Sequence, residues 1–146
     1  EAGAAVTTPW LESAVSPASD GSWIAVVRTG SNERSGLMSA RSTDRGRTWS
    51  PVEPVVAGQD REPVAGKLPG LLLFRNGALV LLTAHSRLGC RIHLSADGTG
   101  REWSEARLVA ERSGGNTSMV ALDENRLLVF TPENRRIRCW RVTVRP

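Results

Sequence analysis

The stretch from Ser42 to Trp49, which reads S-T-D-R-G-R-T-W, constrains the fold of this chain more than any other segment. Asp44 can accept hydrogen bonds from backbone amides just downstream and so stabilise a tight turn. Gly46 can adopt a positive φ without steric cost. Thr48 returns the chain to an extended path, and Trp49 offers a large flat surface for burial against a neighbouring sheet. The stretch therefore predicts a corner between two β-strands.

An altered second copy of this corner occurs from Ser95 to Trp103 and reads S-A-D-G-T-G-R-E-W. It is one residue longer, and Glu102 stands in the place of the Thr. The two Asp residues, Asp44 and Asp97, are 53 positions apart. In both copies the carboxylate is expected to hold a turn rather than to act in catalysis. The residues assigned to this structural role are Ser42, Asp44, Gly46, Thr48 and Trp49 in the first copy, and Ser95, Asp97, Gly100 and Trp103 in the second.

Hairpin turns repeat with a similar spacing. Asp20-Gly21, Asn76-Gly77 and Glu124-Asn125 each separate two apolar runs, as in a tight hairpin. Asn125 is expected in the left-handed conformation, which Asn tolerates better than most residues. The spacings of 56 and 48 residues indicate a repeat of about 50 residues.

The pattern predicts an all-β fold in one domain, 1–146, with repeats at 12–58, 66–112 and 115–146 and a separate strand at 4–10. Leu79–Leu82 and Leu127–Phe130 are continuous apolar runs, which indicates burial on both faces. No segment has the caps and periodicity of a helix. The strands are expected at 14–17, 23–28, 37–41 and 52–56, then at 71–74, 78–84, 91–94 and 107–109, and finally at 118–122, 126–131 and 136–144.

The stretch at 42–49 resembles the Asp-box (S-x-D-x-G-x-T-W) of bacterial-neuraminidase repeats, which occur in sialidase-like β-propellers. The run from Glu62 to Leu82 also looks like the strand–turn–strand core of such repeats. The resemblance implies a sialidase-like propeller with about three four-stranded blades in this chain. Because propellers have typically 4–8 blades, we expect half of a six-bladed ring formed by a homodimer, or part of a longer chain. The strand at 4–10 would complete the last blade of a partner.

Composition also bears on nucleic-acid binding, membrane spans, and disulfide or metal sites. The 19 basic residues are scattered over the chain, and the net charge is +4, so nucleic-acid binding is not expected. No apolar run approaches the roughly 20 residues of a membrane span. Cys90 and Cys139 are too few for a disulfide framework or a metal site, and we expect two thiols buried in strands. No cofactor is expected. Glu1 is not an initiator Met and no signal peptide is visible, so the compartment stays open, with secretion as one option.

Chemistry is expected in the loops at one end of the sheets. If the first strand of each repeat runs away from a channel mouth, the hairpin turns and Asp-boxes lie at the far end. The polar loops that would then line the mouth also contain Glu12, Glu33, Arg34 and Glu133. Acids and bases converging there could perform acid–base work on a glycoside. The catalytic candidates are Asp60, Glu62 and His85, and the ligand-binding candidates are Arg28, Arg61, Lys67, Arg87 and Asn116.

The resemblance does not extend to a full sialidase mechanism. Retaining sialidases use a Tyr nucleophile assisted by a Glu, an Asp acid/base and three Arg that bind the substrate carboxylate. This chain has no Tyr, so neither the chain alone nor its homodimer can follow that mechanism. We expect a propeller module that binds or hydrolyses a carbohydrate at the channel mouth. The alternative is a non-catalytic half-propeller or assembly module without enzymatic activity of its own.

Overall fold

The computed structural model describes residues 12–30, 36–113 and 115–145, and all regular structure in these residues is β-strand. The predicted all-β class is therefore confirmed. The predicted strand at 4–10, together with Glu33 and Arg34, lies outside the described residues. The strands are β1 (Ser13–Pro17), β2 (Trp23–Thr29), β3 (Gly36–Ser42), β4 (Glu53–Pro54), β5 (Val56–Ala57), β6 (Glu62–Pro63), β7 (Lys67–Leu73), β8 (Leu79–His85), β9 (Gly89–Ser95), β10 (Arg107–Ala110), β11 (Ser118–Ala121), β12 (Arg126–Glu133) and β13 (Arg136–Thr143).

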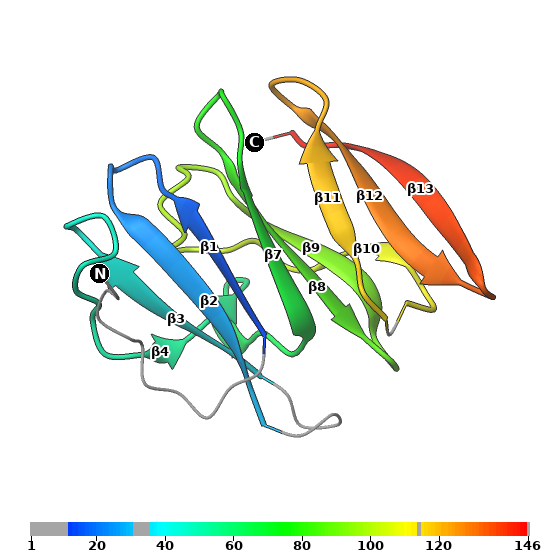
Figure 1. The fold of residues 1–146 in the computed structure, drawn as a ribbon, viewed down its shortest axis with the longest axis horizontal. Coiled ribbons are helices and arrows are strands. Elements are labelled where there is room, and N and C mark those ends of the chain that lie inside the picture. Colours follow the sequence, from blue (N-terminus) through cyan, green and yellow to red (C-terminus); the bar gives the residue numbers. More distant parts are fainter. Residues whose placement is uncertain (1–11, 31–35, 114, 146) are drawn as a thin grey trace.

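Eleven of these strands form three antiparallel sheets in chain order (Figure 1), and β5 and β6 pair as a separate two-stranded hairpin. Sheet one contains β1 to β4, sheet two contains β7 to β10, and sheet three contains β11 to β13. The short hairpin β5–β6 was not predicted, because its two-residue strands lie in a segment whose sequence reads as a loop. The first strands of sheets one and two, β1 and β7, lie side by side, and β7 also contacts β11 of sheet three.

Two apolar layers hold the three sheets together. Between sheets one and two, Ile24 and Val26 of β2 pack in one core with Leu79 and Leu81 of β8. Between sheets two and three, the alternate residues of β8, among them Leu82, pack with β12. Strand β8 is thus buried on both faces, as its continuous apolar run predicts.

Sheet three departs from that prediction. Leu127 and Val129 of β12 are fully buried against sheet two, whereas Leu128 and Phe130 are only half-buried. Within the described residues no further sheet covers the face that Leu128 and Phe130 share. Cys139 pairs with Phe130 on this face and is exposed, while Cys90 is buried. The expectation that both thiols are buried is therefore wrong for Cys139.

The three predicted hairpin turns lie at one end of the sheets (Figure 1). Gly21 and Gly77 have φ of 79° and 91°, the conformation that favours glycine. Asn125 does not have a positive φ, and that prediction is wrong. Instead, Asp123 Oδ1 accepts hydrogen bonds from the amides of Asn125 and Arg126 at 3.2 and 2.9 Å, so the side chain holds this turn.

Candidate functional site

The first Asp-box forms a closed set of hydrogen bonds. Asp44 Oδ1 accepts from the Thr48 amide at 2.8 Å, and Oδ2 accepts from the Thr48 hydroxyl at 2.6 Å. The Ser42 hydroxyl donates to Asp44 Oδ1 at 2.7 Å and accepts from the Gly46 amide at 2.7 Å. The hydroxyl and amide of Thr48, followed by the Ser42 hydroxyl, hold the pKa of Asp44 far below its usual value. This carboxylate is committed to the turn.

The second Asp-box reproduces this pattern with a different Thr. Ser95 Oγ donates to Asp97 Oδ1 at 2.8 Å and accepts from the Gly100 amide at 3.0 Å. Thr99 supplies its amide at 3.0 Å and its hydroxyl at 2.9 Å to the Asp97 carboxylate. By sequence, Glu102 occupies the position that Thr48 has in the first Asp-box. In the structure, the hydroxyl that donates to the Asp97 carboxylate comes from Thr99 instead. The motif is therefore altered in spacing and intact in chemistry.

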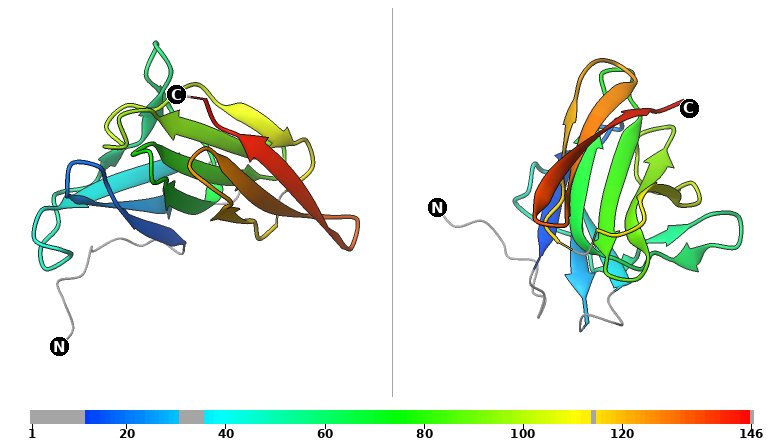
Figure 2. Two further views of the ribbon diagram at one scale, coloured as in Figure 1. Left: turned by 90° about the horizontal axis from the view of Figure 1, so that it is seen from above. Right: turned by 90° about the vertical axis from the view of Figure 1, so that its right-hand side faces the viewer.

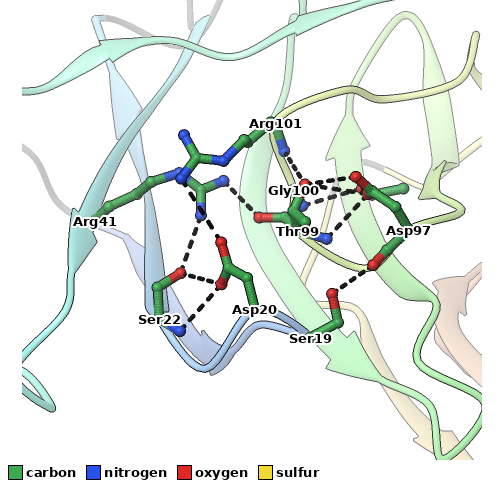
Figure 3. A network of polar contacts seen from close by, with 9 residues as sticks. Ser19, Asp20, Ser22, Arg41, Asp97, Thr99, Gly100 and Arg101 are labelled. Carbon is green, nitrogen blue, oxygen red and sulfur yellow. Dashed lines mark hydrogen bonds and ion pairs between the residues drawn. The ribbon is translucent and has the colours of Figure 1, made fainter.

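A polar network joins the second Asp-box to the β1–β2 turn of sheet one (Figure 3). The Ser19 amide donates to the Gly98 carbonyl at 3.1 Å, and Arg41 donates to the Thr99 carbonyl. Arg101 forms an ion pair of 3.6 Å with Asp20. The Ser22 hydroxyl, followed by the charges of Arg41 and Arg101, keeps the pKa of Asp20 below its usual value. The contacts of the β1–β2 turn and Arg41 with the second Asp-box thus connect sheet one to sheet two at this end.

The opposite end of the sheets carries an ion pair between a buried Arg and a partly exposed Glu. Arg28, at the end of β2, has a side chain that is only 7% exposed, and its Nε lies 3.3 Å from Glu12 Oε2. The same carboxylate oxygen accepts the Leu68 amide at 2.8 Å. Leu68 has a φ of 52° and interrupts the pairing of β7 with β8. Glu12 therefore ties the beginning of sheet one to an irregular point in sheet two.

Four more of the predicted site residues lie near this end, namely the catalytic candidate His85 and the ligand-binding candidates Lys67, Arg87 and Asn116. Lys67 begins β7, His85 ends β8, and Arg87 follows in an exposed turn. Asn116 is exposed just before β11. His85 is buried, and its Nδ1 accepts hydrogen bonds from the amides of Arg87 and Leu88 at 3.1 and 3.3 Å. A neutral His85 therefore carries its proton on Nε2.

The remaining predicted site residues lie elsewhere. Asp60, Arg61 and Glu62 are exposed on the β5–β6 hairpin, which projects from the side of the sheets opposite β1 (Figure 2). Asp60 and Glu62 line a cavity of about 240 Å³ whose other walls include Arg91 and His93 of β9 and Glu105 before β10. His85 and Lys67 are not part of that wall. The structure therefore separates the two predicted carboxylates from the predicted His.

Arg91, His93 and Glu105 were not identified from the sequence. A signal was available, because Arg91 and His93 alternate with the apolar Cys90 and Ile92 in a predicted strand and so share a face. Whether this face of the strand lines a cavity depends on the β5–β6 hairpin, which was not predicted. His93 is 5% exposed, and its Nδ1 lies 2.9 Å from the Ser104 carbonyl. Burial lowers the pKa of His93, partly offset by the Ser104 carbonyl.

Two classes of site are absent from the part of the chain that the structure describes. Its His, Cys, Asp and Glu residues do not form any group of three or more able to hold a metal ion. It also contains no helix with the length and hydrophobicity that crossing a membrane requires.

Comparisons with known proteins define the fold further. No family model and no curated protein matches the sequence. Among solved structures, the chain is similar to a protein of unknown function from Dyadobacter fermentans DSM 18053, with a TM-score of 0.69 and 21% sequence identity. The match covers 98% of this chain and 40% of that protein. At this identity the likeness concerns the fold, and the chain spans less than half of the matched protein's length.

Proposed function

We propose that this chain is a three-sheet segment of a sialidase-like β-propeller and that the end carrying Arg28, Lys67 and His85 binds a carbohydrate. The observation that carries the proposal is the placement of these polar residues at the ends of strands from adjacent sheets. The Asp-boxes, which give the chain its resemblance to that superfamily, make the same hydrogen bonds in two successive sheets. Polar groups converging at strand ends are a common setting for ligand sites.

The proposed activity is binding, with hydrolysis requiring groups from outside this chain. The chain has no Tyr. Asp60 and Glu62 line the cavity with His93, away from His85. Glu12, which lies nearest the buried cation, is engaged by Arg28 and by the Leu68 amide. The proposed site therefore offers donors and cations for a hydroxylated or acidic sugar, and further blades would supply the rest of its lining.

The alternative role as an assembly module has its own supporting observation. Large apolar side chains are exposed on the outward face of sheet three: Val120 is 49% exposed and Ile137 is 79% exposed. The pairing of Val120 with Leu128 and of Ile137 with Pro132 puts them on one face. Soluble proteins usually cover such faces. A second copy of this chain, or further blades of a longer one, would cover it.

A glycan array and direct titration test the binding proposal. We expect Arg87→Ala to weaken binding of an acidic sugar about tenfold, which corresponds to about 1.4 kcal/mol. Arg75→Ala is the matched control, because Arg75 is exposed in the β7–β8 turn at the other end of the sheets. Absence of any glycan binding, or equal losses in both variants, would reject the carbohydrate proposal.

A further inference from the structure

The cavity beside the β5–β6 hairpin is a second candidate site, and we call it the rim cavity. One wall is the hairpin, with Asp60 and Glu62, and the other is formed by Arg91 and His93 of β9 and by Glu105. The hairpin projects on the side of the sheets away from β1 (Figure 2). The rim cavity is therefore separate from the end that carries Arg28, Lys67 and His85.

The hairpin is held close to β9 and β10 by its backbone. The Gly58 amide donates to the Trp103 carbonyl at 2.9 Å. Gly58 has a φ of 74°, and a Cβ at this position would lie 3.1 Å from Glu105 Cγ. Both the positive φ and the close approach to Glu105 favour glycine at this position. The Asp-box Trp thus positions the hairpin as well as filling the core between sheets one and two.

His93 is the buried polar group of the rim cavity. A carbonyl oxygen can only accept a hydrogen bond, so the 2.9 Å contact with Ser104 requires the proton on Nδ1. In a neutral imidazole this leaves Nε2 as an acceptor. No group among the described residues forms a hydrogen bond with Nε2, although His93 is a buried residue and lines the cavity. The ring is thus fixed in orientation and tautomer while one acceptor remains unused.

The combined chemistry of the walls indicates the ligand. Three carboxylates and His93 Nε2 provide acceptors, and Arg91, whose Nε donates to the Leu88 carbonyl at 2.9 Å, provides donors from its terminal nitrogens. Such a set suits a neutral ligand with several hydroxyl groups, which donate to the acceptors and accept from Arg91. At about 240 Å³ the rim cavity is smaller than the usual range for drug-sized ligands, which begins near 300 Å³. We propose that the rim cavity binds a single neutral monosaccharide unit or a polyol of similar size, with His93 Nε2 accepting one of its hydroxyl groups.

A transition metal is the competing occupant, since a His with its Nδ1–H on a carbonyl is also typical of metal ligands. The positions of the side chains argue against it. Although four potential ligands line the cavity, no three of the described His, Cys, Asp and Glu residues are placed to hold one metal ion, and Arg91 adds a positive charge to the wall. The experiment therefore includes Zn²⁺ as a separate probe.

The two His residues of the chain allow a direct test by NMR. The imidazole nitrogens of His93 report on the rim cavity and those of His85 report on the site of the proposed function. We expect D-galactose, D-glucose or glycerol, titrated into the full chain, to shift the His93 signals and leave those of His85 in place. A shift of His85 alone would support the proposed function and overturn the rim site. Shifts of neither His, or of His93 with Zn²⁺ only, would also overturn it.

His93→Asn is the matched variant. The Asn amide can still donate to the Ser104 carbonyl, but the variant lacks the Nε2 acceptor. We expect at least a tenfold loss of sugar affinity with little change in thermal stability. Unchanged affinity would overturn the proposal. Because the titration of the unmodified chain stands by itself, the proposal remains testable even if the variant does not fold.

Discussion

At the scale of single residues, the two Asp-boxes show how one pattern of hydrogen bonds tolerates a changed spacing. Thr48 lies four residues after Asp44, whereas Thr99 lies two residues after Asp97, and both supply an amide and a hydroxyl to the carboxylate. The two Trp residues differ in burial, whereas the hydrogen bonds of the two Asp-boxes are alike. Trp103 is buried between sheets one and two, while Trp49 is only half-buried. The first Asp-box therefore has a less complete apolar environment.

Substitution of two turn glycines tests the packing of the second Asp-box. A Cβ on Gly98 would lie 1.7 Å from the Gly77 carbonyl oxygen, whereas a Cβ on Gly21 meets nothing within 4 Å. Both have positive φ, so Gly21→Ala isolates the conformational cost of about 1–2 kcal/mol. We expect Gly98→Ala to cost at least about 3 kcal/mol by urea unfolding. Equal costs in the two variants would contradict this packing.

Acid should destabilise the protein through the turn carboxylates. The pKa values of Asp20, Asp44 and Asp97 are all lowered by hydrogen bonds in the folded state. Their stabilising contribution is present above the unfolded-state pKa of about 3.9 and is lost as the pH falls toward the folded-state values. We expect the melting temperature to fall on acidification below about pH 4, and to fall less in Asp44→Asn/Asp97→Asn than in Glu111→Gln. An equal fall of the melting temperature with pH in both variants would show that these carboxylates do not contribute to the acid sensitivity.

At the scale of secondary-structure elements, Glu12 connects sheets one and two, because its carboxylate pairs with Arg28 of sheet one and accepts the amide of Leu68 in sheet two. Arg28 is nearly buried, and Glu12 is its ion-pair partner among the described residues, so removing Glu12 takes away the charge that compensates this cation. We expect Glu12→Ala to cost about 2 kcal/mol and Glu12→Ala/Arg28→Leu to recover part of it, as measured by urea unfolding. Glu133→Ala is a suitable control, because its partner Arg138 is largely exposed. Additive losses in the double variant would argue against the coupling.

Local patterns predicted most of the sheets and little of the site. The turns at Asp20-Gly21 and Asn76-Gly77 and the run Leu79–Leu82 follow from short-range rules, and the structure contains them. The hairpin β5–β6 depends on long-range contacts, such as that of Gly58 with Trp103, and no local pattern indicates it. The rim cavity that involves His93 follows from that hairpin. The partial exposure of Phe130 likewise depends on whether another sheet covers this face. The apolar run Leu127–Phe130 does not reveal whether such a sheet is present.

At the scale of the whole molecule, the two thiols report on the outward face of sheet three. Burial raises the pKa of Cys90 to about 11, so this thiol should be unreactive near pH 8. Cys139 is exposed on the face with Phe130. We expect a thiol reagent to label one Cys in dilute native protein and two after unfolding. Labelling of Cys139 should slow as protein concentration rises, because association would cover this face. A rate independent of concentration would contradict that coverage.

We propose that a second copy of this chain covers the outward apolar face of sheet three, where Val120 and Ile137 are exposed. The most direct test is the solution mass of the purified chain, measured by light scattering after size exclusion. For a chain of 15.8 kDa, the proposed pairing of two segments predicts a mass of twice this value, with Cys139 protected. A folded, monodisperse species at the mass of a single chain, with Cys139 freely reactive, would contradict the claim.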